Sequence, residues 1–316
     1  MNRILKRHHY IPRLYLSGFV SCKKKKQIWV LNKKELKQYQ TSIEKTACEK
    51  FFYDIDISEL GFDYVENAIG EVENNAAAAI NEVLNELRMP AGDNFNYLME
   101  FIALQAARVP STINRFKSFY KSKGEKAADT FADSEESYKK IFSLLDEALQ
   151  AKYKEVSYEK IKDFVLNKKY YIEVDNLPLM ILMFEMYEKI LPSFLKREWS
   201  IIYIKTGIDF FICSDNPVIV YWNKPRPVSI LSSHVYQMIE DTEIIFPLSK
   251  EVALIGQAKR QYEKLEATAA HIAHINTLIY KFAEQFIYST EENFKLSGRN
   301  KATGIISIID YNKPNI

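Results

Sequence analysis

The chain has 316 residues, and its 43 basic and 41 acidic side chains give a formal net charge of +2, which excludes a protein-wide field that would attract nucleic acid or a membrane surface. Hydrophobic residues make up 47% of the sequence and glycine and proline are few, which argues against a disordered chain and against a turn-rich β-sandwich. This length can bury a sizeable core and predicts one compact domain over residues 1–316, or two intimately packed ones.

Short extended segments are predicted near the start of the chain. The four lysines at residues 23–26 are typical of a solvated hairpin tip, with a phosphate-binding patch as the alternative. The apolar residues 27–31 that follow predict a strand, and residues 51–57 predict a second short extended piece.

Helices are predicted for most of the chain between residues 60 and 195. Apolar side chains recur at three- and four-residue steps through residues 63–87, and a second helix is expected at residues 94–120, kinked or broken by Pro110. The charged residues 121–136 predict a loop or a mobile helical connection. Helical periodicity returns at residues 138–151, 158–166 and 177–195.

Short β-rich segments follow at residues 198–205, 209–214, 217–222, 243–248 and 252–256. A last amphipathic helix is expected from about residue 263 to residue 286, before a polar tail. Helices, then strands, then a helix predict an α+β fold. We expect it to be predominantly helical, with a small, mainly antiparallel sheet formed by the N-terminal segment and residues from about 198 to 256. Its sub-regions would be helical (60–195) and β-rich (1–57 with 198–260).

Cysteine content and hydropathy indicate the compartment. The three cysteines, Cys22, Cys48 and Cys213, are odd in number and far apart, which argues against a disulfide framework and for a reducing environment. The first residues lack the apolar core of a signal peptide, and no apolar stretch reaches the ~20 residues that span a bilayer. We therefore expect a cytoplasmic protein without a membrane partner.

The first polar cluster is His8-His9-Tyr10, near the start of the chain. Adjacent residues of an extended segment point to opposite faces, so at most one histidine should join any given site. The near-neutral pKa of imidazole suits a metal ligand or a general acid or base, and Tyr10 is a candidate for substrate binding. Packing and hydrogen bonding in the core is the alternative role.

The second cluster combines two predicted helices. Glu66 and Glu73 lie only about 20° apart on a helical wheel, at the border of the apolar face, so each needs a cation, a metal ion or a proton. Gln105 and Arg108 fall on the apolar arc of the next helix. A buried bridge from Arg108 to a glutamate is expected, and Arg108 could hold a substrate phosphate at the same time. Arg115 is expected to add a second positive group.

The third cluster is the segment 213–217, where Asp215, Asn216 and Pro217 follow an apolar run. These residue types fit a tight turn in which Asp or Asn side chains bond their own backbone. A loop at the end of a strand can equally present Asp215 and Asn216 to a site. The pair His271 and His274 has helical spacing for a metal, although a packing or surface role is the simpler interpretation.

The first cluster resembles the opening of a widespread bacterial family, domain of unknown function 4238, whose members begin with a similar His-His-Tyr-x-Pro-x-x-Tyr-Leu motif. Further similar pieces follow in the same order: Phe52-Tyr53, the helix with Glu66 and Glu73, Gln105-x-x-Arg108-x-Pro110, Ser214-Asp215-Asn216-Pro217, Phe246-Pro247-Leu248-Ser249 and a late helix with Asn276. The resemblance implies that the three clusters belong to one site, and it implies no activity.

The leading hypothesis is a metal-dependent hydrolase or nuclease that acts on a phosphodiester in nucleic acid or in a nucleotide. The ligand set Glu66, Glu73 and Asp215, with His8 or His9, would bind Mg²⁺ or Mn²⁺ or activate water, and Arg108 would stabilise phosphate charge. A role in phage defence or as a toxin is a further expectation, based only on the type of family.

Two other functions remain open. In a non-catalytic binding or sensor module, the same side chains would form a buried hydrogen-bonded network that fixes the fold, and Asp215 would only cap a turn. In a nucleic-acid-binding protein without cleavage, the lysines 23–26 and the basic residues 115, 117, 121 and 123 would act beside exposed tyrosines.

Overall fold

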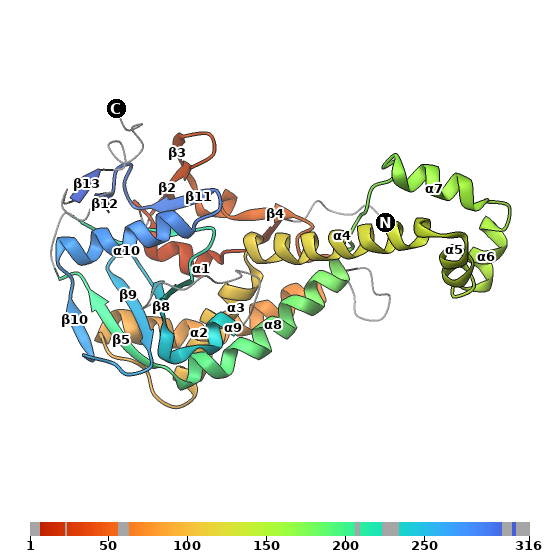
Figure 1. The fold of residues 1–316 in the computed structure, drawn as a ribbon. Coiled ribbons are helices and arrows are strands. Elements are labelled where there is room, and N and C mark those ends of the chain that lie inside the picture. Colours follow the sequence, from red (N-terminus) through yellow and green to blue (C-terminus); the bar gives the residue numbers. More distant parts are fainter. Residues whose placement is uncertain are drawn as a thin grey trace.

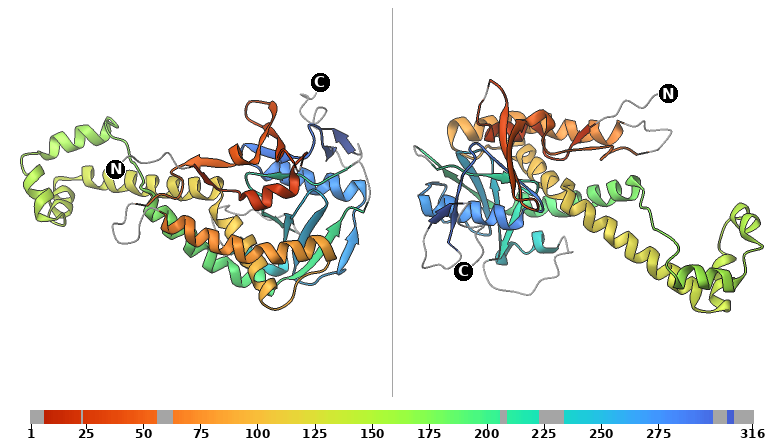
Figure 2. Two further views of the ribbon diagram at one scale, coloured as in Figure 1. Left: turned by 180° about the vertical axis from the view of Figure 1, so that it is seen from behind. Right: turned by 90° about the horizontal axis from the view of Figure 1, so that it is seen from above.

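The computed structural model describes residues 7–22, 24–55, 63–205, 209–222, 234–298 and 305–307. A mixed helical and β-stranded body makes up most of the molecule, and one long helix, α4 (Pro110–Asp133), projects from it (Figure 1). Three short helices lie at the far end of α4: α5 (Glu135–Phe142), α6 (Glu147–Tyr153) and α7 (Tyr158–Leu166). We call residues 110–175 the arm. Two further views show the same separation of arm and body (Figure 2).

Three helices form the helical side of the body. α2 (Tyr64–Glu86) and α8 (Asn176–Lys196) both pack against α3 (Asp93–Arg108), whose residues from Leu98 to Arg108 are nearly all buried. α2 ends where Leu87 adopts a left-handed conformation, with φ of 50°. α3 ends at Arg108, and α4 begins at Pro110, because proline has no N–H to donate and suits the first turn of a helix. The predicted break at Pro110 is therefore confirmed.

A five-stranded sheet in the order β10-β5-β9-β8-β7 forms one side of the body. Its strands are β5 (Glu198–Tyr203), β7 (Ile219–Trp222), β8 (Thr242–Pro247), β9 (Val252–Gln257) and β10 (Lys264–Glu266). All neighbours are antiparallel except β10 and β5. Five of the six residues of β9 are buried, so this central strand reads as a continuous apolar run.

A four-stranded sheet joins the two halves of the sequence, in the order β3-β2-β11-β6. Its strands are β2 (Gln27–Asn32), β3 (Lys37–Ser42), β6 (Cys213–Ser214) and β11 (Phe286–Ser289). The pairs β1 (Arg7–His9) with β4 (Cys48–Lys50), and β12 (Lys295–Ser297) with β13 (Ile305–Ser307), form two smaller sheets. The remaining short helices are α1 (Arg13–Leu16), η1 (Ser17–Phe19), η2 (Ile43–Lys45), α9 (His234–Gln237) and η3 (Ile239–Asp241), and α10 (Ala269–Phe282) is the last long one.

The α+β class and the mainly antiparallel pairing are confirmed, but several boundaries differ from prediction. The strands form separate sheets, because β2 pairs with β11, which lies beyond residue 256, while β5, β7, β8 and β9 form a sheet without any strand of the N-terminal segment. Residues 121–133 continue α4 as a helix, and the segment 138–151 divides into α5 and α6. The extended piece expected at residues 51–57 is wrong for residues 51–53, which form a turn after β4, and residues 56 and 57 lie outside the described part.

The last predicted helix was too long at both ends. Residues 264–266 form the edge strand β10, and Phe286 begins β11 instead of ending a helix. The turn expected before residue 27 is present at residues 24–26, whereas Lys23 is outside the described residues. Within the described ranges, no helix is both long enough and apolar enough to pass through a bilayer. The single compact domain stays a prediction, to which the structure adds the projecting arm.

The largest core cluster joins the N-terminal segment, the helices and the five-stranded sheet. The buried ring of Tyr15 stacks on Phe246 with centroids 5.0 Å apart and lies 6.4 Å from the centroid of Phe101. Its hydroxyl donates a hydrogen bond of 2.6 Å to the carbonyl of Pro247. This contact satisfies the one polar atom of a large buried side chain, so Tyr15 fixes α1 against the end of β8.

Two glycines provide a test of packing in the body. A Cβ on Gly256 would lie 2.9 Å from the buried Trp199 side chain, whereas a Cβ on Gly70 in α2 would meet nothing within 4 Å. We expect Gly256→Ala to lower the free energy of unfolding by about 1–3 kcal/mol through overpacking. Gly70→Ala should raise it by about 0.5–1 kcal/mol, because alanine loses less entropy in a helix. Urea denaturation followed by circular dichroism measures both, and equal effects would contradict the described packing.

Candidate functional site

His8 on β1 is held in one tautomer by the backbone. Its side chain is 1% exposed, and its Nδ1 accepts a hydrogen bond of 3.0 Å from the N–H of Tyr53. In a neutral imidazole the proton must therefore be on Nε2. Nε2 lies 3.5 Å from Oδ1 of Asp54 and 3.7 Å from Oε2 of Glu66, too far for good hydrogen bonds. His8 thus directs an N–H between two carboxylates.

His9 points to a different environment, as expected for neighbouring residues of a strand. Burial lowers its pKa, and the nearby Arg13 lowers it further. Hydrogen bonding to the backbone of Ile43 and Glu44, and the charge of Glu73, raise the pKa by less. His9 is therefore neutral at pH 7, and its Nε2 is buried without a hydrogen-bond partner in the described structure.

The predicted buried bridge is present and involves Glu73. Nη1 of Arg108 donates a 2.7 Å hydrogen bond to Oε1 of Glu73, with the arginine side chain 0% exposed and the glutamate 25% exposed. The side-chain oxygen of Gln105 faces the other edge of the guanidinium and accepts from Nη2 and, at 2.8 Å, from Nε. Tyr53 lies beside the pair: burial raises the pKa of its hydroxyl, which Arg108 lowers by less. All sides of this guanidinium are occupied by protein.

Asp215 accepts hydrogen bonds from the backbone of a segment that is distant in sequence. Its Oδ1 accepts from the N–H of Glu284 at 2.9 Å, and its Oδ2 accepts from Gln285 and Phe286 at 2.7 and 2.8 Å. Burial raises the pKa of the carboxyl, and the three backbone hydrogen bonds oppose that shift. The prediction that Asp215 bonds its own turn is wrong; Ser214 does so, since its hydroxyl accepts from the N–H of Asn216.

Tyr10 brings the first and third clusters together. Its hydroxyl lies 3.2 Å from that of Tyr288 on β11, and burial raises the pKa of both phenols. The carboxylate of Asp215 raises both values further. Lys33 donates to the carbonyls of Tyr280 and Ala283 at the end of α10; burial lowers its pKa, and the nearby charge of Asp215 opposes that shift. The three predicted clusters therefore share one region, in which His8, Arg108 and Asp215 are buried and Glu66 and Glu73 are partly exposed.

The predicted metal ligands do not share a centre. Within the described ranges, no group of three or more His, Cys, Asp or Glu side chains is arranged to hold a metal ion. Glu73 is paired with Arg108, and both oxygens of Asp215 are taken by backbone N–H groups. His8 does not fit either, because coordination through Nε2 would require a proton on Nδ1, which already accepts from Tyr53. Binding of Mg²⁺ or Mn²⁺ stays a prediction.

The other predicted residues have local partners. Arg115 donates to the hydroxyl of Thr112 at 3.0 Å on its own helix, and Asn216 donates to the carbonyl of Phe282 at 3.1 Å. His271 belongs to the N-terminal capping box of α10, and His274 meets the ring of Tyr221 edge-on. Asn276 is fully buried and bonds the backbone of residues 210, 212 and 295. These contacts support structural roles.

Sequence reasoning missed several members of this region. Tyr53 was noted only as part of a motif, and Asp54, Lys33 and Tyr288 were not identified at all. Each lies in a segment whose neighbours in space come from another part of the chain, so no local spacing marks it. The one usable signal was Asp54 next to Phe52-Tyr53, a carboxylate that follows aromatic residues.

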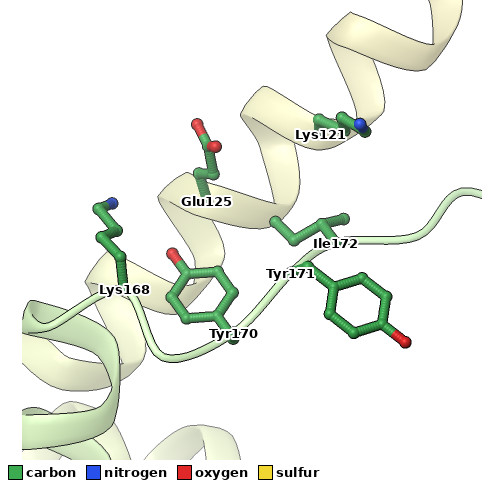
Figure 3. Close-up of a pocket in the computed structure, with 6 residues that line it drawn as sticks. All are labelled: Lys121, Glu125, Lys168, Tyr170, Tyr171 and Ile172. Carbon is green, nitrogen blue, oxygen red and sulfur yellow. The ribbon is translucent and has the colours of Figure 1, made fainter.

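Two hollows lie away from these clusters. The larger, about 350 Å³, lies between α4 and residues 168–172 of the arm (Figure 3). The second, about 200 Å³, is lined by Asp209, Phe210, Ile272 and residues 291–295. Neither is lined by a residue of the three predicted clusters.

Comparison with known proteins gave one match. The family model described as "Protein of unknown function (DUF4238)" matches residues 7–293. No curated protein and no solved structure gives a significant match.

The three hydrogen bonds to Asp215 lead to a stability prediction. Asp215→Asn places an amide NH₂ opposite at least one backbone donor, so at least one N–H group loses its acceptor and the charge that strengthens the other hydrogen bonds is removed. We expect the free energy of unfolding to fall by about 2–4 kcal/mol in urea denaturation. The control Asp163→Asn removes an exposed carboxylate that pairs with Lys169. It should leave stability unchanged within error, and equal losses for both variants would argue against the described role of Asp215.

The lowered pKa of His9 predicts a pH dependence of stability. Because the folded-state pKa is below the unfolded value of about 6.5, only the unfolded state gains a proton as the pH falls from about 7 through 6.5. Stability should therefore decrease over this range and fall further until the folded state also binds the proton. His274, whose pKa burial also lowers, contributes in the same direction. His9→Gln should reduce the slope of unfolding free energy against pH; an unchanged slope would contradict it.

Proposed function

Because the chain belongs to the DUF4238 family, whose description assigns no activity, its function has to be inferred from its own side chains, and we propose that it is a non-catalytic binding module. In this proposal, the His, Glu, Arg and Asp clusters form a buried network that stabilises the body. Nucleic acid or a nucleotide is the proposed ligand, and the arm is the proposed binding element.

One observation carries the proposal: Arg108 and Asp215, predicted to bind phosphate and metal, already have partners within the protein. Arg108 is 0% exposed and is held by Glu73 and Gln105, so a substrate phosphate would have to displace both. Asp215 is 4% exposed and accepts three backbone hydrogen bonds. A hydrolase needs phosphate-binding and metal-binding groups that are free for substrate, metal or water, and these two groups are engaged by the protein itself.

The proposed compartment is the cytoplasm. The three cysteines are all in described segments and are all free, with Cys213 buried and the other two half-buried. Free thiols are typical of a reducing compartment. This placement is compatible with a nucleic-acid or nucleotide ligand.

A metal-dependent hydrolase or nuclease, with a role in phage defence or as a toxin, is the second candidate. The observation that favours it is the position of His8 between Asp54 and Glu66, since the Glu66 side chain is 38% exposed and reachable from solvent. An imidazole beside two carboxylates is a common acid–base arrangement. This candidate depends on a ligand set that forms only when metal or substrate binds.

A double-mutant cycle tests whether Glu73 and Arg108 act as a structural pair. Glu73→Met leaves a fully buried guanidinium without its counter-charge and should cost about 3–5 kcal/mol of unfolding free energy. The double variant Glu73→Met with Arg108→Met removes both charges. It should be clearly more stable than the sum of the single losses predicts, with a coupling of about 1–3 kcal/mol.

Hydrolysis assays on the same proteins decide between the two candidates. We expect no cleavage of single-stranded DNA, RNA or nucleotides above background with Mg²⁺ or Mn²⁺, and no bound metal by elemental analysis. Glu66→Gln serves as the probe for the second candidate, because it keeps the shape of a half-exposed side chain. Wild-type cleavage that Glu66→Gln abolishes at unchanged stability would overturn the binding-module proposal.

A further inference from the structure

The arm contains the larger hollow, formed where the chain returns along α4. Its lining consists of Lys121 and Glu125 from α4 and Lys168, Tyr170, Tyr171 and Ile172 from the returning segment (Figure 3). Its volume, about 350 Å³, is at the lower end of the range of small-molecule sites. The hollow therefore has room for one small ligand or one unit of a longer one.

Two features of the sequence bring the returning segment to this position. Gly124 permits close approach, since a Cβ there would lie 2.8 Å from Cδ1 of Ile172. Lys168 follows α7 in a left-handed conformation, with φ of 49°, at a place where glycine is usual. A lysine therefore occupies the left-handed position that follows α7, and its side chain lines the hollow.

Two ammonium groups in the hollow are available to an anion. Lys168 lies 3.9 Å from the carboxylate of Asp129, but both side chains are more than 60% exposed, so this ion pair is weak. Among the described residues, no ion pair involves Lys121. Lys121 and Lys168 come from opposite walls and lie at opposite ends of the hollow in Figure 3. Two successive phosphate groups, one beside each lysine, match this placement.

The other lining groups can bind a nucleobase by stacking and by hydrogen bonding. Tyr171 is 85% exposed, the most exposed of the large aromatic and aliphatic side chains in the described structure, and its ring offers an uncovered face. Bases stack on such rings, with little dependence on sequence. Glu125 lies between the two lysines in Figure 3, and a carboxylate accepts hydrogen bonds from an exocyclic amino group such as that of cytosine.

We propose that this hollow binds nucleotide units, with one phosphate beside Lys121 and the next beside Lys168. The amino edge of one base points toward Glu125, and a neighbouring base stacks on Tyr171, whose side chain points away from α4 in Figure 3. The inference rests on the proposed function and adds the site and the base preference. An acidic peptide matches the hollow less well, because it offers no planar partner to Tyr171 and no amino edge to Glu125. The nucleotide unit is either free or part of a single strand.

Fluorescence anisotropy with the full chain and a labelled single-stranded oligodeoxycytidylate tests the site. The double variant Lys121→Gln with Lys168→Gln should bind about ten-fold or more weakly, with a salt slope reduced by about 1.4, the value for two phosphate contacts on a single strand. Tyr171→Ala should lose about five-fold or more, the effect of one lost stack. Lys126→Gln, an exposed lysine on α4 outside the hollow, is the matched control and should bind like wild type.

Three further comparisons identify the ligand. Wild type should prefer oligodeoxycytidylate to oligothymidylate, and Glu125→Ala should lose that preference. Cytidine monophosphate as competitor separates the two sources: displacement at low concentration indicates a free nucleotide, and weak displacement indicates a strand. Oligoglutamate that binds as tightly as the oligonucleotide would replace the proposal with a peptide site.

Two outcomes overturn the proposed site. If the double variant binds as wild type does, the site is wrong while nucleic-acid binding stands. If wild type does not bind the probe at low salt, the proposed nucleic-acid ligand is wrong as well. Gel analysis of the probe after incubation with Mg²⁺ or Mn²⁺ is a separate readout. Cleavage with binding still dependent on Lys121 and Lys168 would refute the non-catalytic function and leave the site standing.

Discussion

The structure of the body depends on neutralising a charge that has no access to water. The guanidinium of Arg108 is 0% exposed at the end of α3, where an unpaired cation would be prohibitively costly. Glu73 supplies the counter-charge from α2, and Gln105 supplies an acceptor from one turn earlier in α3. Tyr53, next to Arg108, donates its backbone N–H to His8. Helix packing and the placement of the N-terminal strand are therefore linked through this one pair.

A second carboxylate fixes the sheet that joins the two ends of the sequence. Asp215 follows β6 and receives three N–H groups from residues 284–286, at the point where the chain leaves α10 and enters β11. β11 then pairs with both β2 and β6. The carboxylate of Asp215 thus fixes the start of β11, where β11 and β6 share only a short ladder of backbone hydrogen bonds. Its raised pKa reflects the cost of burying it.

The body and the arm differ in the burial and pairing of their polar side chains. In the body, the side chains of Arg108, Asp215 and Asn276 are buried and hydrogen-bonded, as expected for groups that specify one fold. In the arm, Lys121, Lys168, Glu125 and Tyr171 line a surface hollow, and α4 buries only three of its residues. Such a division suits a protein in which a stable body carries a recognition element. It also explains why the overall balance of charge gives no sign of a local binding site.

The sequence by itself determined the helices α2, α7 and α8, the break at Pro110 and the strands β2, β5, β8 and β9. Apolar periodicity and proline act over a few residues and can be read directly. It also indicated that Arg108 pairs with a glutamate, since both lie on predicted buried arcs. Only the tertiary structure decided that this glutamate is Glu73 and that β2 pairs with β11. It also decided that Asp215 accepts hydrogen bonds from the backbone of residues 284–286. Those choices depend on contacts between segments up to 260 positions apart in the chain, and such contacts leave no local pattern in the sequence.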